Sequence, residues 1–192
     1  MTRYREGDVR AFERLLRRHK KPVFNFLWRQ VGDRAAAEEL LQEVFLRVIK
    51  SAPTYQEQAK FTTWLYTIAR NLCVDAARRA GHRRTISLDA PSVGSDGEAE
   101  RPLGDTLSDP AGDIERQALA RELRARLERA IAQLPEDQRE VFLMRERSGL
   151  PFKEIASIVG VPENTVKSRM RYALERLREA LAEYRDVAEA VR

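Results

Sequence analysis

The sequence predicts an all-α fold: two small helical domains, an N-terminal helical bundle and a C-terminal helix-turn-helix domain, joined by a flexible acidic linker. Apolar residues recur at helical spacing along most of the chain, and no clear alternating strand pattern occurs. Glycine and proline are few, at 9 and 8 of 192 residues. The periodicity stops between residues 86 and 113, where Ser, Pro, Gly and acidic residues predominate. We therefore place the domains at 1–85 and 114–184, the linker at 86–113 and a tail at 185–192.

The N-terminal bundle begins with two expected helices that are marked by their terminal residues. Asp8 is a suitable N-cap for the first helix, and Pro22 fits the first turn of the second. Gly32 ends the second helix, and Asp33 caps a third over about residues 34–50. Each of these helices has an apolar edge that can contribute to a small core.

The expected helix at 34–50 has two distinct faces. One is an ordinary core stripe, formed by Ala37, Leu41, Val44, Phe45 and Val48. The other mixes acids, an amide, a lysine and a leucine: Glu39, Gln42, Glu43, Leu46 and Lys50. A solvated face usually carries more charge and no lone leucine, so this second stripe favours a docking site for a protein partner. An ordinary solvated face remains the alternative.

The segment 61–84, FTTWLYTIARNLCVDAARRAGHRR, is the helix around which we expect the chain to be organised. Its apolar stripe consists of Phe61, Trp64, Leu65, Ile68 and Leu72. Off that stripe lie polar and basic residues, with a basic cluster at the end: Thr63, Thr67, Arg70, Arg78, Arg79, Arg83 and Arg84. Aromatic rings stack on unpaired bases and guanidinium groups hold phosphates, so the pattern fits a single-stranded nucleic acid. An amphipathic core helix with a solvated back fits it equally well.

Positive charge is concentrated in the two predicted domains. The chain carries a net charge of +5, made up of +9 in the N-terminal domain, −6 in the linker and +2 in the remainder. Two cationic helical segments separated by an acidic strip favour a protein that binds a polyanion over an enzyme of small metabolites. The sequence contains no GxxxxGK[ST] phosphate loop, no metal-ligand set and no nucleophile with a base at identifiable spacing. We therefore expect no enzymatic activity, no cofactor and no metal.

Cysteine content and hydropathy indicate the cellular compartment. Cys73 is the only cysteine, which excludes an intramolecular disulfide and a cysteine-based metal cluster, and we expect it to be a packing residue. No apolar run is long enough to span a bilayer, and the N-terminus lacks the apolar segment of a secretory signal. The sequence therefore predicts a cytoplasmic protein without membrane insertion.

Helical periodicity returns in the C-terminal domain. It resumes at Ile114, and Pro135 starts a further helix over about residues 136–147. A short helix is expected at 152–159, directly before the strongest motif in the chain.

That motif is the small–Gly–aliphatic spacing within FKEIASIVGVPENTVKSRMR. Ala156 is small enough for two helices to cross closely, and Gly160 supplies a left-handed turn. Val166 then pins the second helix onto the first. This spacing is what a helix-turn-helix requires.

The second helix of the motif has an apolar and a polar side. We expect its inward side to comprise Val166, Met170, Ala173, Leu174, Leu177 and Leu181. Its opposite side presents amides, hydroxyls and charges: Glu163, Asn164, Thr165, Lys167, Ser168, Arg169 and Arg171. Such groups hydrogen-bond base edges and phosphates in a DNA major groove. A purely structural helical hairpin is the alternative.

Three blocks of the sequence, in this order, resemble the extracytoplasmic-function (ECF) subfamily of sigma-70-type RNA polymerase sigma factors. They are EELLQEVFLRV at 38–48, FTTWLYTIARN at 61–71, and LPEDQREVFLMR…LPFKEIASIVGVPENTVKSRMRYALERLRE at 134–179. The resemblance covers most of the chain outside the N-terminal helices and the linker. It implies a factor that binds core polymerase, directs it to specific promoters and promotes strand opening.

The resemblance also assigns roles to individual positions. It implies docking on the clamp helices of the largest polymerase subunit by residues of the third helix: Glu38, Glu39, Gln42, Glu43 and Leu46, with Phe45 packing inward. It implies capture of the non-template strand near −10 by Lys60, Phe61, Trp64, Arg70, Asn71, Arg78 and Arg79, of which Trp64 also belongs to the apolar stripe. The helix-turn-helix residues given above would read the duplex near −35.

Further partners follow from the same resemblance. They are the flap region of the second-largest polymerase subunit and an anti-sigma protein that covers these surfaces. The acidic linker is expected to stand in for RNA near the active-site cleft. The competing hypothesis is a two-domain helix-turn-helix regulator that binds duplex DNA without joining polymerase. That hypothesis explains the C-terminal half but leaves the third helix and the 61–84 segment unexplained.

Overall fold

The computed structural model describes residues 1–55, 60–86 and 110–184, with the backbone alone described at 81–86, 110–116 and 183. Every regular element within these ranges is helical, as the sequence predicts. Most of the predicted linker and the tail at 185–192 lie outside the described residues, and so do the side chains of Arg83 and Arg84.

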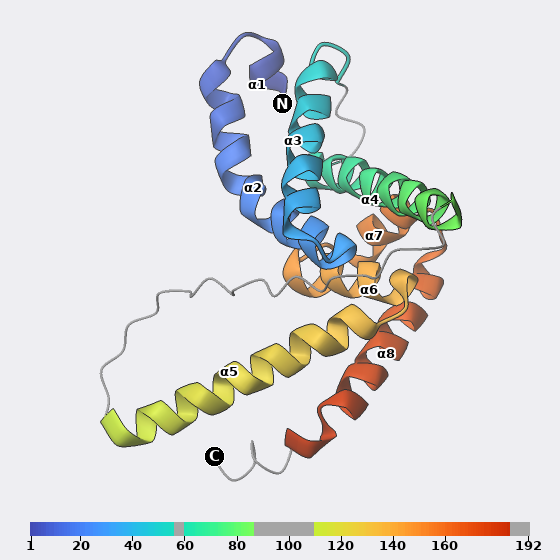
Figure 1. Cartoon of the computed structure of the whole chain (residues 1–192). Helices are drawn as coiled ribbons and strands as arrows, with labels where there is room; N and C mark the ends of the chain where they lie inside the picture. Colours follow the sequence, from blue (N-terminus) through green and yellow to red (C-terminus); the bar gives the residue numbers. More distant parts are fainter. Residues whose placement is uncertain (56–59, 87–109, 185–192) are drawn as a thin grey trace.

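The N-terminal domain contains α1 (Thr2–Arg5), α2 (Val9–Val31), α3 (Arg34–Lys50) and α4 (Phe61–Ile86). In Figure 1, α2 and α3 lie side by side, and α4 runs across them. The expected caps are confirmed, because the Asp8 carboxylate accepts the amide of Ala11 at 3.0 Å and Asp33 accepts that of Ala36 at 2.8 Å. Gly32 ends α2 in the left-handed conformation, with φ of 76°.

The expected break at Pro22 is wrong, since α2 continues through it as one helix. Proline removes one backbone donor and strains the preceding turn, but tertiary packing can offset that cost. Val23, Phe26 and Leu27, directly after the proline, are almost fully buried in the core. Burial of this apolar side therefore keeps α2 helical both before and after Pro22.

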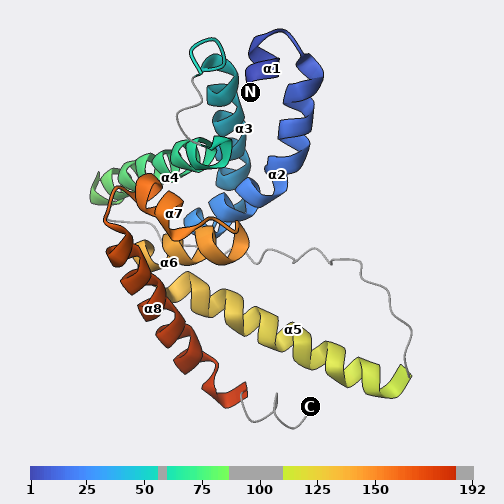
Figure 2. The ribbon, with the colours of Figure 1, turned by 180° about the vertical axis from the view of Figure 1, so that it is seen from behind.

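The C-terminal domain contains α5 (Pro110–Gln133), α6 (Glu136–Phe142), the π-helical turn η1 (Leu143–Arg147), α7 (Phe152–Val159), α8 (Glu163–Ala180) and the short 3₁₀ turn η2 (Ala182–Tyr184). Its first helix starts at Pro110, four residues before the expected start at Ile114, because proline suits a first helical turn. Figures 1 and 2 show α5 and α8 diverging from the rest of the molecule.

The predicted helix-turn-helix is formed by α7, Gly160 and α8. Gly160 has φ of 75° and ψ of 32°, and its amide donates to the carbonyl of Ala156 at 2.9 Å. Val166 is fully buried and Ala156 packs against the core, as their spacing predicts. Leu174 was expected on the inward side, but it is 42% exposed, because the buried face of α8 runs through Met170, Ala173 and Leu177 and leaves Leu174 beside it.

The two domains share one continuous apolar core. α4 packs against α7, and α2 packs against α6 and η1, as both views show. Cys73 of α4 lies in this core, as expected, and burial raises the pKa of its thiol to about 12. The N- and C-terminal halves therefore form a closed arrangement rather than two separate bodies.

Replacing Gly160 by Ala should lower the free energy of unfolding by about 1–2 kcal/mol, because a β-carbon strains the left-handed conformation. No atom beyond the adjacent residues lies within 4 Å of the new carbon, so the expected loss comes from backbone strain and not from a clash. Urea unfolding measures the change. Gly160→Asn should lose less, because asparagine tolerates this conformation better. Equal stability of wild type and Gly160→Ala would contradict the assignment of Gly160 as the left-handed turn between α7 and α8.

Candidate polymerase and nucleic-acid interfaces

The polar stripe of α3 is open to solvent. Glu38, Glu39 and Gln42 are exposed, and Leu46 is 47% exposed. The Glu43 carboxylate accepts the Arg47 guanidinium at 2.8 Å, a bond that, together with the positive charge, holds the pKa of Glu43 below its usual value. This face therefore presents acidic and amide groups around an exposed leucine.

Ile49 extends this stripe and was missed by the sequence analysis. It lies one turn beyond Leu46 and is 39% exposed. Its position off the core stripe was readable from the sequence, because residues three apart on a helix are neighbours. Phe45 is buried and packs inward, in agreement with the expectation for it.

The aromatic residues of α4 are shared between the core and the surface. Phe61 and Trp64 are half-buried, with ring centroids 5.8 Å apart. Tyr55 meets Trp64 edge-on at 5.0 Å, and the His19 ring lies 5.3 Å from that of Phe61. The rings are therefore held in place by the bundle while part of each remains accessible.

Three polar residues of α4 and its approach contact carboxylates of the C-terminal domain. Lys60 Nζ lies 2.6 Å from Glu154 Oε1, and the Thr63 hydroxyl donates to Glu154 Oε2 at 2.8 Å. Arg70 Nε donates to Glu140 at 2.8 Å. Thr63 is only 6% exposed, although its place off the apolar stripe suggested a free surface.

Three further polar side chains of α4 are exposed. Asn71, Arg78 and Arg79 all lie on the surface. Arg78 forms a long ion pair of 3.9 Å with Asp75, and Arg79 donates to the backbone carbonyl of Asp75. These two guanidinium groups are therefore available to a phosphate at little cost.

Glu140 and Glu154, the carboxylates that accept these contacts, have pKa values shifted in opposite directions. Glu140 is 5% exposed, and burial raises its pKa despite the Arg70 and Arg169 guanidinium groups beside it. Burial also acts to raise the pKa of Glu154, but hydrogen bonds from Lys60 and Thr63 outweigh it and leave that pKa below its usual value. The Glu154 contact thus favours the charged carboxylate.

The recognition face of α8 is largely exposed. Asn164, Thr165, Lys167, Ser168 and Arg171 lie on the surface, with Glu163 half-buried. Two of its cations have acidic neighbours one turn away: Lys167 pairs with Glu163 at 2.7 Å, and Arg171 with Glu175 at 3.8 Å.

Arg169 and Tyr172 differ from the sequence expectation for this face. Arg169 is directed toward α6, where it pairs with Asp137 at 3.1 Å and with Glu140 at 3.8 Å. Tyr172 is 46% exposed, and the Arg171 guanidinium lies 4.9 Å from the centre of its ring. The tyrosine was missed because it follows the polar stretch rather than standing within it.

Among the described residues, no group of three or more His, Cys, Asp and Glu residues is arranged to hold a metal ion. None of the helices described is both long enough and apolar enough to cross a membrane.

The fold and these surfaces define a helical DNA-binding protein with a helix-turn-helix. Residues 15–83 match the family described as Sigma-70 region 2, and residues 124–177 match Sigma-70, region 4. The RNA polymerase sigma factor CarQ of Myxococcus xanthus is 36% identical over 95% of this chain and 96% of its own. The RNA polymerase sigma-H factor of Pseudomonas aeruginosa is 32% identical over 94% and 91%. The chain therefore belongs to the ECF subfamily of the sigma-70 family, and its relatives are sigma factors rather than enzymes.

A solved structure supports the same fold. The sigma factor RpoE of Bartonella quintana, in complex with the anti-sigma factor NepR, matches with a TM-score of 0.72. The match covers 91% of this chain and 98% of that one at 23% sequence identity. The similarity extends over both domains.

Proposed function

We propose that this protein binds core RNA polymerase, directs it to promoters with −35 and −10 elements, and promotes strand opening. The observation that carries the proposal is the joint exposure of the α3 stripe and the α8 recognition face, in a chain of the sigma-70 family. Polymerase supplies the catalysis, and this chain acts in the cytoplasm by binding alone.

The α3 stripe is the proposed docking site for the clamp helices of the largest polymerase subunit. An accessible leucine and isoleucine, surrounded by carboxylates and an amide, form a small apolar centre with a polar rim. The carboxylates favour a basic partner surface and oppose an acidic one, which gives orientation as well as affinity. The flap region of the second-largest subunit is the proposed partner of the C-terminal domain.

The exposed residues of α8 are proposed to read duplex DNA near −35. Asn164 and Arg171 carry amide and guanidinium groups that pair with base edges, while Lys167 suits a phosphate. Arg169 is better placed to hold α6 than to reach a base, since two carboxylates of that helix bind it. Each good base contact contributes about 1–3 kcal/mol of discrimination.

The α4 segment is proposed to capture the non-template strand near −10. Melting costs about 1–2 kcal/mol per base-pair step, and each base stacked on an aromatic side chain returns about 1–3 kcal/mol. Phe61 and Trp64 offer partly accessible rings, with Asn71, Arg78 and Arg79 on the same helix. A few captured bases therefore suffice to balance local melting once polymerase is bound.

An anti-sigma protein is a further proposed partner. The sigma factor RpoE of Bartonella quintana was solved with such a protein, NepR, and shares this fold. The exposed apolar residues of α3 give such a partner a surface that polymerase also needs. Competition for that surface would keep the protein from binding core polymerase.

The second candidate function is a regulator that binds duplex DNA without joining polymerase. The exposed recognition helix α8 supports such a regulator as strongly as it supports a sigma factor. Core polymerase separates the two, because a regulator of that kind does not bind core enzyme in the absence of DNA.

Purified protein added to core polymerase should bind it without DNA and yield promoter-specific transcripts from genomic fragments.

Gln42→Ala with Glu43→Ala should weaken core binding, because both side chains lie on the α3 stripe. Fluorescence anisotropy of labelled protein measures that affinity. A Glu13→Ala variant, on the exposed surface of α2, serves as the control. Wild-type protein that yields no promoter-specific transcript would contradict the proposal.

Arg171→Ala should weaken upstream duplex binding about 5- to 150-fold, the equivalent of about 1–3 kcal/mol for one lost base contact. Footprinting of holoenzyme on a selected promoter measures the loss. Arg176→Ala removes the same charge from an exposed position further along α8 and should leave the footprint intact. If both variants behave like wild type, Arg171 does not contact the −35 element.

A further inference from the structure

A stripe of basic side chains runs along the solvent side of α2, and the proposed function does not use it. Its members are Arg10, Arg14, Arg17 and Lys21, and all four are exposed. Their spacing of four, three and four residues places them on one face of a helix. At about 1.5 Å per residue, the four positions extend over about 16 Å of the helix axis. We call these four residues the α2 basic stripe.

The opposite face of α2 supplies the core. Val23 and Phe26 are buried there, and the ring of Phe12 meets that of Phe45 in α3 edge-on. The basic stripe therefore takes no part in the packing of the bundle. Because the buried face anchors α2, the stripe is held on a rigid helix and its side chains keep a fixed order in space.

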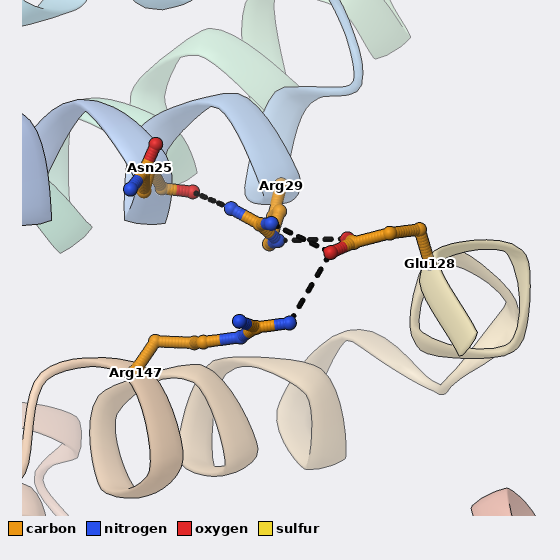
Figure 3. A network of polar contacts seen from close by, with 4 residues as sticks. All are labelled: Asn25, Arg29, Glu128 and Arg147. Carbon is orange, nitrogen blue, oxygen red and sulfur yellow. Dashed lines mark hydrogen bonds and ion pairs between the residues drawn. The ribbon is translucent and has the colours of Figure 1, made fainter. Parts of the chain in front are cut away.

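Arg29, near the end of α2, shows how an arginine with a structural role is placed in this protein. In Figure 3 its guanidinium points at Glu128 of α5, and it binds both carboxylate oxygens, at 2.6 and 2.8 Å. Arg147 donates to the same carboxylate at 3.2 Å. Among the described residues, the basic stripe has one ion pair with an acid, between Arg14 and Asp8 at 3.1 Å, and both of those side chains are exposed. The stripe is therefore open to an external anion.

The basic stripe opposes the stability of α2. Like charges one turn apart repel each other, and the spacing creates this repulsion between Arg10 and Arg14 and again between Arg17 and Lys21. The whole helix contains one acid, Glu13, against seven Lys and Arg residues. A bound polyanion would relieve the repulsion, whereas nothing in the packing of the bundle requires these charges.

Duplex DNA is the polyanion that this geometry fits. The phosphates of each strand are spaced about 3.4 Å apart along the duplex axis, so a rigid stripe about 16 Å long meets several of them at once. A single strand is held largely by stacking on aromatic rings, and the stripe contains none. An anionic membrane surface favours a helix with apolar residues beside its cations, but the described part of α2 exposes one large apolar side chain, Val9.

We propose that the α2 basic stripe binds the phosphate backbone of duplex DNA, independently of the base sequence. The proposal takes from the proposed function only that promoter DNA is the partner, and it needs neither polymerase docking nor strand opening. Contacts from Arg and Lys to phosphates position a protein on a duplex without reading its bases. The stripe thus gives the N-terminal domain a duplex contact of its own, in addition to the recognition face of α8.

The test replaces the stripe by glutamine in the full chain, as Arg10→Gln, Arg14→Gln, Arg17→Gln and Lys21→Gln together. Fluorescence anisotropy measures binding to a labelled duplex of random sequence at several salt concentrations, without polymerase. The stripe variant should bind about tenfold or more weakly at low salt. Each lost phosphate contact lowers the slope of log affinity against log salt by about 0.9, so the slope should fall by about 2–4.

The matched control removes the same charge from exposed positions of the C-terminal domain, as Arg121→Gln, Arg124→Gln, Arg129→Gln and Arg178→Gln together. Its salt slope should stay at the wild-type value. Equal losses in the two variants would overturn the proposal, because net charge alone would then explain them. Wild-type protein that does not bind the duplex at low salt would overturn it as well.

Thermal unfolding separates a binding role of the stripe from a structural one. The stripe variant should unfold at or above the wild-type temperature, because glutamine forms helices as well as Lys and Arg do and the repulsion is removed. A lower unfolding temperature would assign the four side chains to the fold and overturn the proposal.

Two further probes distinguish the duplex from other polyanions: a labelled single strand, and vesicles of phosphatidylcholine mixed with phosphatidylglycerol. Loss of binding to either probe, with duplex binding intact, would overturn the proposal. Transcription with core polymerase is scored separately. A wild-type protein that binds the duplex through the stripe but never transcribes refutes the proposed function and leaves this proposal standing.

Discussion

The burial of α4 on two sides is the constraint on which the structure depends. One side closes the core of the N-terminal bundle, where Leu65 and Ala69 are fully buried. Another side meets α7, where Thr63 is shielded and bonded to Glu154. The helix α4 therefore packs in both domains at once. Any movement of one domain relative to the other changes which side chains of α4 are exposed.

This constraint links the fold to the proposed function. The residues proposed to read the −10 element differ in availability, since Lys60 and Arg70 have carboxylate partners in the other domain while Asn71 is exposed. The α3 and α8 surfaces do not share this restriction. In the proposed function, the α3 and α8 surfaces are therefore accessible in this structure, whereas Lys60 and Arg70 are engaged by carboxylates of the C-terminal domain.

Local features were predictable from the sequence because their causes are local. The caps at Asp8 and Asp33 and the turn at Gly160 each depend on a few neighbouring residues, and all three are confirmed. The continuous helix through Pro22 was not predictable, because tertiary packing outweighs the local cost of proline.

The candidate site was only partly predictable for the same physical reason. Helical periodicity places Gln42 and Leu46 on one exposed stripe, and the structure has both exposed. The pairing of Arg70 with Glu140 joins residues 70 positions apart, and no local pattern indicates it. The exposure of Leu174 depends on which positions of α8 the neighbouring helices cover, which the spacing on α8 does not reveal.

Resonance energy transfer between the domains tests the account most directly. Labels at Lys21→Cys in α2 and Glu146→Cys in η1, two elements that pack against each other, report the separation, and the buried Cys73 thiol, with a pKa of about 12, does not compete for them. Transfer should be efficient in the free protein and fall when core polymerase and promoter DNA are added. Unchanged transfer in a complex that has opened promoter DNA would contradict the account.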